Sequence, residues 1–139
     1  MKTIGTSRSS GFTLIEMLIV VAIVALLAAI AIPNYSQYVL RGYRTEARNL
    51  MLEIAAQQER FQYANPGYAA TLPLLGKLDV QPTTNGKYNV TMIATALTYT
   101  LRATPTLSQA SDRCGWLQIN HLGVQTQQSI NPADRCWRK

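Results

Sequence analysis

Glu16 is a carboxylate in an apolar segment, and it therefore needs either water or a positively charged partner. It lies within residues 12–32, where Thr13 is the only other polar side chain. A carboxylate at membrane depth costs about 2–3 kcal/mol, so Glu16 either reaches the membrane interface or has a positively charged partner. A cut between Gly11 and Phe12 would create such a partner, because the new α-amino group is positive at neutral pH. Glu16 lies one helical turn beyond Phe12 and could neutralise that amine in its own chain or in a neighbouring copy.

The other reactive side chains are two cysteines, Cys114 and Cys136, and a single histidine, His121. They are too few for a structural zinc site, so no metal is expected. In an exported chain, two cysteines favour a disulfide, which would close a loop of about 20 residues and stabilise the fold by roughly 3 kcal/mol. His121 falls at a predicted turn and is expected to be solvated. Because the sequence has no nucleophile–base set and no phosphate-binding loop, we expect no catalytic residues, no cofactor and no enzyme.

Residues 12–32 form the element that must hold Glu16. About 20 apolar residues in a helix, rising 1.5 Å each, span the ~30 Å hydrocarbon core of a bilayer. Lys2 and Arg8 precede this apolar run, which predicts a cytoplasmic N-terminus and places the chain beyond residue 33 across the membrane. A secretory signal has a shorter apolar core and a cleavage site after it. We therefore expect this run to be retained as a membrane anchor.

A helical period continues beyond the apolar run, and it predicts one helix to about residue 64, in two halves, 12–34 and 35–64. Pro33 lacks a backbone N–H and is expected to kink or loosen this helix, and Gly42 is a second weak point. Charged residues such as Arg44 are assigned to other faces than the apolar stripe of the second half, whose members are Tyr35, Tyr38, Val39, Tyr43, Ala47, Leu50, Ile54 and Phe61. The tyrosines that begin the stripe fit either an aromatic belt at the membrane interface or packing on neighbouring residues. A bundle of identical or related chains is expected to cover the first half, and such a contact generates a fibre when it does not close.

The remainder of the sequence predicts a small head domain. Residues 65–87 contain three prolines and three glycines and are expected to form a long loop with one short turn near 72–78. Alternating apolar and polar side chains then predict four strands at 88–94, 97–103, 117–120 and 124–127. Short turns between them imply an antiparallel sheet within 88–127 that packs one face on the second half of the helix. The expected fold class is α+β.

The charge of the chain is basic, with 13 Lys and Arg against seven Asp and Glu, and 11 against seven without residues 1–11. Nucleic-acid binding is only weakly indicated, because no basic run is interleaved with aromatic side chains. The C-terminal end holds one cluster of interest, which consists of Arg113, Arg135, Arg138 and Lys139. Two interpretations stay open for it: a modest basic patch that binds DNA or a surface, and a solvated tail.

The stretch GFTLIEMLIVVAIVALLAAIAIPNY resembles the class III leader junction and N-terminal helix of type IV pilins. This resemblance implies that a prepilin peptidase removes the leader, residues 1–11, by cutting after Gly11, and that it methylates Phe12. It also implies that Glu16 is the assembly glutamate of the family and that Pro33 is its helix-bending proline. The apolar helix would serve as an inner-membrane anchor and later as the core of a fibre.

The rest of the chain is similar to the same family. Residues 65–87 correspond to the pilin αβ-loop, and Cys114 and Cys136 to the disulfide that bounds the variable D-region, here 114–139. The stretch YTLRATPTLSQASDRCGWLQINHLG, with CW near the end, looks like the PilE-like minor pilins. The resemblance implies the pilin fold, in which a long N-terminal helix packs its C-terminal half on a four-stranded antiparallel sheet and a disulfide closes a C-terminal loop.

The function that this resemblance implies is that of a structural subunit of a type IV pilus, with a minor pilin as the favoured role in assembly or priming, twitching motility, adhesion or DNA uptake. The implied partners are other major and minor pilins in a helical filament, the prepilin peptidase, and an inner-membrane assembly platform with cytoplasmic ATPases. Weak DNA or surface binding is a further implied contact. The subunit would first be a single-pass inner-membrane protein with a periplasmic head and later part of an extracellular pilus.

Two alternatives share the leader and Glu16, namely a major pilin of the same system and a pseudopilin of a type II secretion system. Major pseudopilins usually bind calcium through acidic C-terminal loops and lack the disulfide. In this sequence the C-terminal loops hold only Asp112 and Asp134, and two cysteines are present. The pilus subunit is therefore the favoured interpretation.

Overall fold

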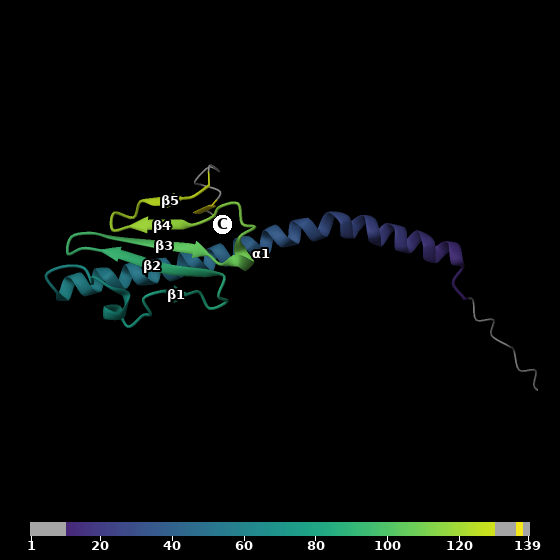
Figure 1. Ribbon diagram of the computed structural model, residues 1–139. Coiled ribbons are helices and arrows are strands. Elements are labelled where there is room, and N and C mark those ends of the chain that lie inside the picture. The colour runs from purple at the N-terminus through teal and green to yellow at the C-terminus, as the bar shows by residue number, and fades with distance from the viewer. Residues whose placement is uncertain (1–10, 130–135, 138–139) are drawn as a thin grey trace, which may run out of the picture. The chain divides into compact units, whose positions relative to one another are not determined.

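The computed structural model describes residues 11–129, 136 and 137 of the chain (Figure 1). A single long helix, α1 (Leu14–Ala64, 51 residues), comes first. The chain divides into two compact units, one ending at Gln37 and the other starting at Tyr38. Helix α1 therefore contributes its first half to one unit and its second half to the other.

The first half of α1 is apolar around its whole circumference. Its large side chains are largely exposed, for example Leu14 (78%), Ile23 (55%) and Ile32 (69%). At its start the hydroxyl of Thr13 accepts the backbone N–H of Glu16 (3.3 Å), which satisfies one of the unpaired donors of the first turn. By length and composition the helix can cross a bilayer. A helix without a polar face needs an apolar environment, which either lipid or other helices supply.

The second unit contains a five-stranded antiparallel sheet in the order β1-β2-β3-β4-β5, so that each strand pairs with its neighbours in sequence. The strands are β1 (Gln81–Pro82), β2 (Tyr88–Ala94), β3 (Tyr99–Pro105), β4 (Leu117–Asn120) and β5 (Gln125–Gln127). Two short 3₁₀-helices, η1 (Leu72–Leu75) and η2 (Leu107–Gln109), lie in the connections. Figure 1 shows the resulting meander.

The sheet has five strands, whereas the sequence predicted four. The additional strand, β1, lies in the segment predicted as a loop, where Gln81 and Pro82 pair with Val90 and Asn89 of β2. Two residues are too few for the alternation that identifies a strand in a sequence. The proline is tolerated because β1 lies at the edge of the sheet. The short turn predicted near 72–78 is present as η1.

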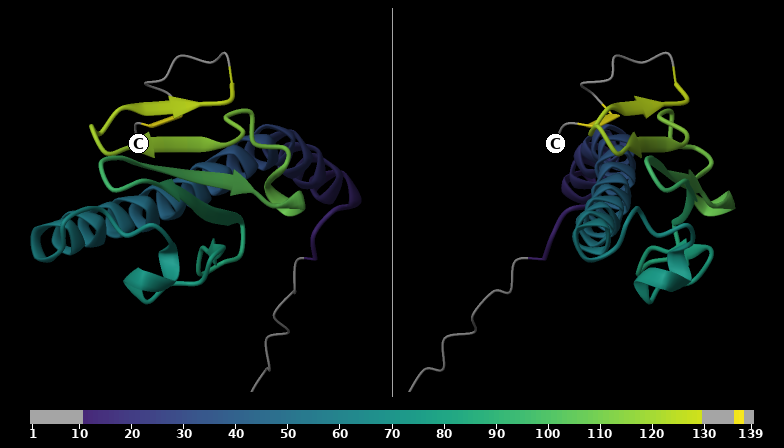
Figure 2. Two further views of the ribbon diagram at one scale, coloured as in Figure 1. Left: turned by 60° about the vertical axis from the view of Figure 1, so that its left-hand side comes forward. Right: turned by 90° about the vertical axis from the view of Figure 1, so that its left-hand side faces the viewer.

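The core of the second unit lies between residues 38–64 of α1 and one face of the sheet (Figure 2). From the helix, Ala47, Met51 and Ile54 are fully buried. They belong to one cluster with the inward side chains of the strands, which include Tyr88, Val90, Tyr99, Leu101, Ala103, Leu117 and Ile119. Because successive side chains of a strand point to opposite faces, the alternate residues of β2–β5 face away from α1. The predicted α+β fold, a helix on an antiparallel sheet, is confirmed.

Candidate functional site

The predicted cleavage and pairing site lies at the start of α1. Gly11 and Phe12 precede the helix, and Phe12 is 75% exposed. A side chain at position 11 would meet no described atom within 4 Å, so packing does not require a glycine there. The cleavage predicted after Gly11 stays a prediction. Glu16 is exposed in the first turn of α1, where a carboxylate also suits the positive end of the helix dipole.

Helix α1 continues through both positions at which the sequence predicted a weak point, Pro33 and Gly42. A side chain at Gly42 would meet no described atom within 4 Å, so packing within the described residues does not explain this glycine. Neither position ends the helix. The bending or loosening predicted at Pro33 and Gly42 stays a prediction.

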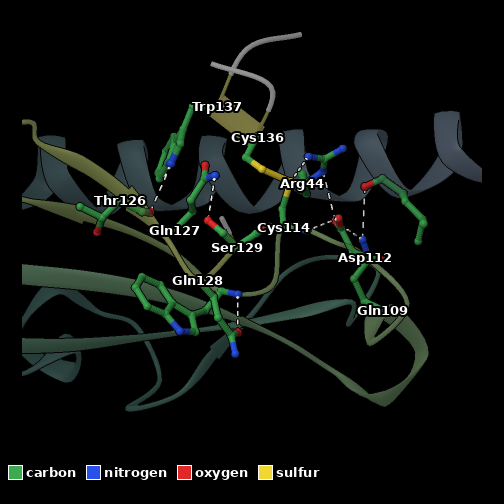
Figure 3. The surroundings of a disulfide bond; sticks show 12 residues. Arg44, Gln109, Asp112, Cys114, Thr126, Gln127, Gln128, Ser129, Cys136 and Trp137 are labelled. Atoms are coloured by element: carbon green, nitrogen blue, oxygen red, sulfur yellow. Dashed lines mark hydrogen bonds and ion pairs between the residues drawn. A yellow bond between two sulfur atoms is a disulfide. The ribbon is translucent and has the colours of Figure 1, made fainter. Parts of the chain in front are cut away.

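Cys114 and Cys136 form the predicted disulfide, with their Cα atoms 5.8 Å apart (Figure 3). Both cysteines are buried in the core cluster. The adjacent Trp137 is buried as well; its indole N–H donates to the carbonyl of Thr126 (3.2 Å), and the Arg48 guanidinium lies 5.9 Å from its ring centroid. The described C-terminal residues are thus fixed to β5 and to α1.

A buried ion pair lies beside the disulfide and joins α1 to the segment before β4 (Figure 3). Arg44 Nε lies 3.1 Å from Asp112 Oδ2, and both side chains are less than 10% exposed. A second guanidinium nitrogen of Arg44 donates to the sulfur of Cys114. The backbone N–H of Cys114 donates to Asp112 Oδ1 (3.0 Å). One arginine and one aspartate therefore hold the disulfide-bonded segment on the helix.

Asp112 also accepts hydrogen bonds from two other buried side chains. The hydroxyl of Tyr88 donates to Oδ2 (3.0 Å), and so does Nε2 of Gln109 (3.0 Å), which also donates to the carbonyl of Leu40 on α1 (3.2 Å). Burial, and then the negative charge of Asp112, raise the pKa of Tyr88 far above its ordinary value. Because a buried polar group needs partners, this cluster fixes the positions of α1, β2 and the β3–β4 connection together.

The prediction that Arg44 faces away from the apolar stripe was wrong. The side chains buried on α1 recur at Arg44, Ala47, Met51, Ile54 and Gln58, a spacing of three or four residues. This spacing is visible in the sequence and would have found both polar members. Asp112 carried no such signal, because its partner lies 68 residues earlier in the chain.

Gln58 performs a similar role at the other end of the helix. Its side-chain amide pairs with the backbone of Ala69 in both directions, donating to the carbonyl (2.9 Å) and accepting the N–H (2.9 Å). Glu59, the next residue, accepts hydrogen bonds from the hydroxyls of Tyr68 (3.2 Å) and Tyr99 (3.2 Å). These contacts hold the start of the αβ-loop against α1 and β3.

The basic cluster predicted near the disulfide is described at one position only. Arg113 is exposed, whereas Arg135, Arg138 and Lys139 lie outside the described residues. His121, predicted to be solvated at a turn, is partly exposed at the end of β4 and lies 6.3 Å from Tyr99 between ring centroids. The predicted basic patch therefore stays a prediction.

Two family models match the chain. One, described as a prokaryotic N-terminal methylation motif, matches residues 6–32. The other, described as type IV minor pilin ComP, DNA uptake sequence receptor, matches residues 33–118, which is more than half of the chain. The chain belongs to the type IV pilins. The resemblance found in the leader and helix is thereby confirmed.

Curated proteins similar to this pilin are named as pilins or fimbrial proteins. It is 36% identical over 91 residues to the type IV major fimbrial protein FimA of Dichelobacter nodosus, covering 63% of this chain and 54% of that protein. It is 46% identical over 54 residues to the type IV major pilin protein PilA of Myxococcus xanthus, covering 39% of this chain and 24% of that protein. The match to fimbrial protein EcpC of Eikenella corrodens is 60% identical over 40 residues, 29% of this chain and 26% of that protein. The pilin thus spans between a quarter and about half the length of these relatives.

A solved structure supports the fold of the pilin. A type IV pilin from Shewanella oneidensis superposes with a TM-score of 0.54 at 29% identity, covering 72% of this chain and 99% of that chain. The family and its relatives are structural subunits, so this pilin is not an enzyme. Its N-terminal helix is long and apolar enough to cross a membrane, and its relatives are named as pilins or fimbrial proteins.

Proposed function

We propose that this pilin is a minor pilin that serves DNA uptake. The observation that carries the proposal is the match to the ComP model, whose description names a minor pilin and a DNA uptake sequence receptor. The match extends over residues 33–118 and so includes the second half of α1, strands β1–β3 and the first two residues of β4. It therefore extends over most of the head and is not limited to the N-terminal helix.

The proposal includes a maturation route. A prepilin peptidase cuts after Gly11 and methylates Phe12, which fits a glycine that packing does not require. Lys2 and Arg8 keep the N-terminus cytoplasmic, and the head is periplasmic until an assembly platform with cytoplasmic ATPases moves the subunit into the filament. There the carboxylate of Glu16 pairs with the α-amino group of Phe12 in a neighbouring subunit, where the low dielectric of the helix core strengthens the attraction.

Mass spectrometry of sheared filaments, combined with a deletion strain, tests the minor role. A minor pilin is expected at a small fraction of the main subunit, with an N-methylated Phe12 terminus. Its deletion is expected to lower uptake of added DNA while filaments remain. Complementation with the wild-type chain restores uptake and controls for effects on neighbouring genes.

A second candidate function is that of the major pilin, which the names of the relatives from Dichelobacter and Myxococcus favour. The same experiment separates the two. A major pilin dominates the mass spectrum of the filaments, and its deletion removes them. That result would replace the minor role with the major one.

A further inference from the structure

The face of the sheet that α1 leaves uncovered has an unusual set of side chains. We call it the outer sheet face and define it by eight residues of β2–β5 and their ends, which are Thr91, Thr100, Arg102, Thr104, Trp116, Gln118, Asn120 and Thr126. The register places Thr91, Arg102, Gln118 and Thr126 in one row across four strands. All eight are exposed or partly exposed. The face is therefore a mainly polar surface that crosses most of the head, with the exposed Ile93 beside Thr100 as an apolar side chain at one end.

Arg102 is held in one position on this face. Its guanidinium lies 4.6 Å from the ring centroid of Trp116, and its Nε and one terminal nitrogen donate to Oε1 of Gln118 (3.2 and 2.9 Å). A guanidinium has five N–H donors, so these two bonds leave three for a ligand. Because the side chain is already ordered, binding costs less rotamer entropy than an unrestrained arginine would lose.

The side-chain amides around Arg102 use their oxygen atoms inside the protein. Oε1 of Gln118 accepts from Arg102, and Oδ1 of Asn120 accepts the backbone N–H groups of Leu122 (3.0 Å) and Val124 (2.9 Å). Oε1 of Gln128 beside them accepts the N–H of Trp116 (3.3 Å). The NH₂ group of each amide is a donor, and none has a partner among the described residues. The face therefore offers mainly hydrogen-bond donors.

The described strands place no carboxylate on this face. The acidic residues in the described part of the chain are Glu16, Glu46, Glu53 and Glu59 on α1, Asp79 before β1, and the buried Asp112. Among the described residues of the outer sheet face, Arg102 is thus the charged side chain, and no described carboxylate on that face neutralises it. A ligand rich in acceptors and negative charge complements such a surface, and the phosphodiester backbone of DNA is that ligand.

We propose that the outer sheet face binds the phosphate backbone of double-stranded DNA, with Arg102 as its central phosphate contact and Trp116 and Gln118 as the residues that position it. This inference rests on the proposed role in DNA uptake and assigns that role a surface. Since residues 38–64 of α1 cover the opposite face, a filament that buries its helices leaves this face outward. Contacts of this kind fix a protein on a duplex and do not read its sequence.

The test measures binding of a fluorescent duplex of about 20 base pairs to the full processed pilin in uncharged detergent, at about 50 and about 200 mM salt. Arg102→Gln removes the central contact and is expected to weaken binding about tenfold at the lower salt. Each lost phosphate contact lowers the salt slope by about 0.9, so the difference from wild type is expected to shrink about 3.5-fold at the higher salt. The change is expected to be the same for duplexes of different sequence.

Two substitutions at Thr104 and one control substitution show whether a change in binding has a cause other than misfolding. Thr104 is exposed on the same face of β3, so Thr104→Lys is expected to tighten binding and Thr104→Glu to weaken it. Arg60→Gln is the matched control, because Arg60 is exposed on α1 and its loss changes the net charge as much as Arg102→Gln does. Circular dichroism confirms that each variant is folded.

The outcomes separate the inference from the function on which it rests. If the wild-type pilin binds the duplex and Arg102→Gln, Thr104→Lys and Thr104→Glu all leave that binding unchanged, the DNA site lies elsewhere. This result would overturn the inference, while the role in DNA uptake stands. A wild-type pilin that binds no duplex at the lower salt overturns both. Binding of heparin that depends on Arg102, without binding of DNA, would make the face a site for anionic polysaccharide and overturn the inference as stated.

Discussion

Replacement of Asp112 is expected to be among the most destabilising single changes in the head. Asp112→Ala removes the ion-pair partner of Arg44, whose side chain is 9% exposed. It also removes the acceptor for the hydroxyl of Tyr88 and for Nε2 of Gln109. Removing one partner of a buried ion pair costs about 3–5 kcal/mol, because the other charge remains buried without compensation. This is a large share of the roughly 5–15 kcal/mol that stabilises a typical domain.

The tryptophans provide a convenient assay. Trp116 and Trp137 are the only two in the chain, and both lie in the head, so their fluorescence reports unfolding of the head while the apolar helix stays in detergent. Asp112→Ala is expected to lower the free energy of unfolding in urea by about 3–5 kcal/mol and the melting temperature by about 12 °C or more. Asp79→Ala removes an exposed acid and is expected to change stability by less than about 0.5 kcal/mol.

A double-mutant cycle with Arg44→Met decides whether the ion pair is the cause. Once Arg44 is gone, Asp112→Ala no longer leaves a buried charge unpaired, so the double variant is expected to lose less than the sum of the two single losses. The two losses would simply add if each residue acted alone. An additive cycle, or a loss below about 1 kcal/mol for Asp112→Ala, refutes the reasoning.

Four other changes have expected outcomes. Cys136→Ser opens the disulfide loop, whose cysteines are 22 residues apart, and is expected to lower the free energy of unfolding by about 3 kcal/mol. Urea unfolding measures this loss, and faster proteolysis of the C-terminal end should accompany it. Unchanged stability would contradict the prediction. The folded state keeps the proton of Tyr88 above the ordinary tyrosine pKa, and the unfolded state loses it. Tyr88 alone is therefore expected to lower stability by up to about 1.4 kcal/mol per pH unit above about pH 10, and Tyr99, whose pKa burial also raises, adds to the fall. Tyr88→Phe should show a shallower fall, and an equal slope in both proteins would remove Tyr88 as its source. Glu16→Ala is expected to insert in the membrane but to be scarce in sheared filaments on immunoblots, and wild-type incorporation would show that the amine–carboxylate pair is not needed. Gly11→Leu is expected to leave an uncut precursor, visible as a heavier band, while normal processing would contradict the leader assignment.

The fold was predictable where one side-chain pattern extends over enough residues. The long helix and the strands β2–β4 each show such a pattern, so the α+β fold and the antiparallel order followed from the sequence. The disulfide followed from the presence of two cysteines in a chain expected to be exported. β1 was not predictable, since two residues show no period and their pairing with β2 depends on a loop that returns to the sheet edge. The sequence predicted that the second strand begins at residue 97, whereas β3 begins at Tyr99. The residues before Tyr99 belong to a turn in which the hydroxyls of Thr95 and Thr98 are hydrogen-bonded to each other.

The polar contacts of the head were less predictable, because they join residues distant in sequence. The short spacing that marks Arg44 and Gln58 as buried could be read from the chain, but their partners Asp112 and Ala69 could not. The same limit applies to the outer sheet face. Arg102, Trp116 and Gln118 become neighbours only through the register of β3 and β4, so the sequence directed attention to the C-terminal arginines instead.

Net charge is a poor guide to what this pilin can bind, because carboxylates of the same chain neutralise two of its cations. Arg44 pairs with Asp112, and Lys77 bonds to Glu53 at 2.6 Å. A cation that already has a carboxylate partner adds little to the attraction of a phosphate, because the pair is neutral at a distance. Arg102 differs, since its partners are an aromatic ring and an amide oxygen, which orient the guanidinium without cancelling its charge. A site for a polyanion is therefore better sought where an arginine is held by neutral groups than where basic residues are most numerous.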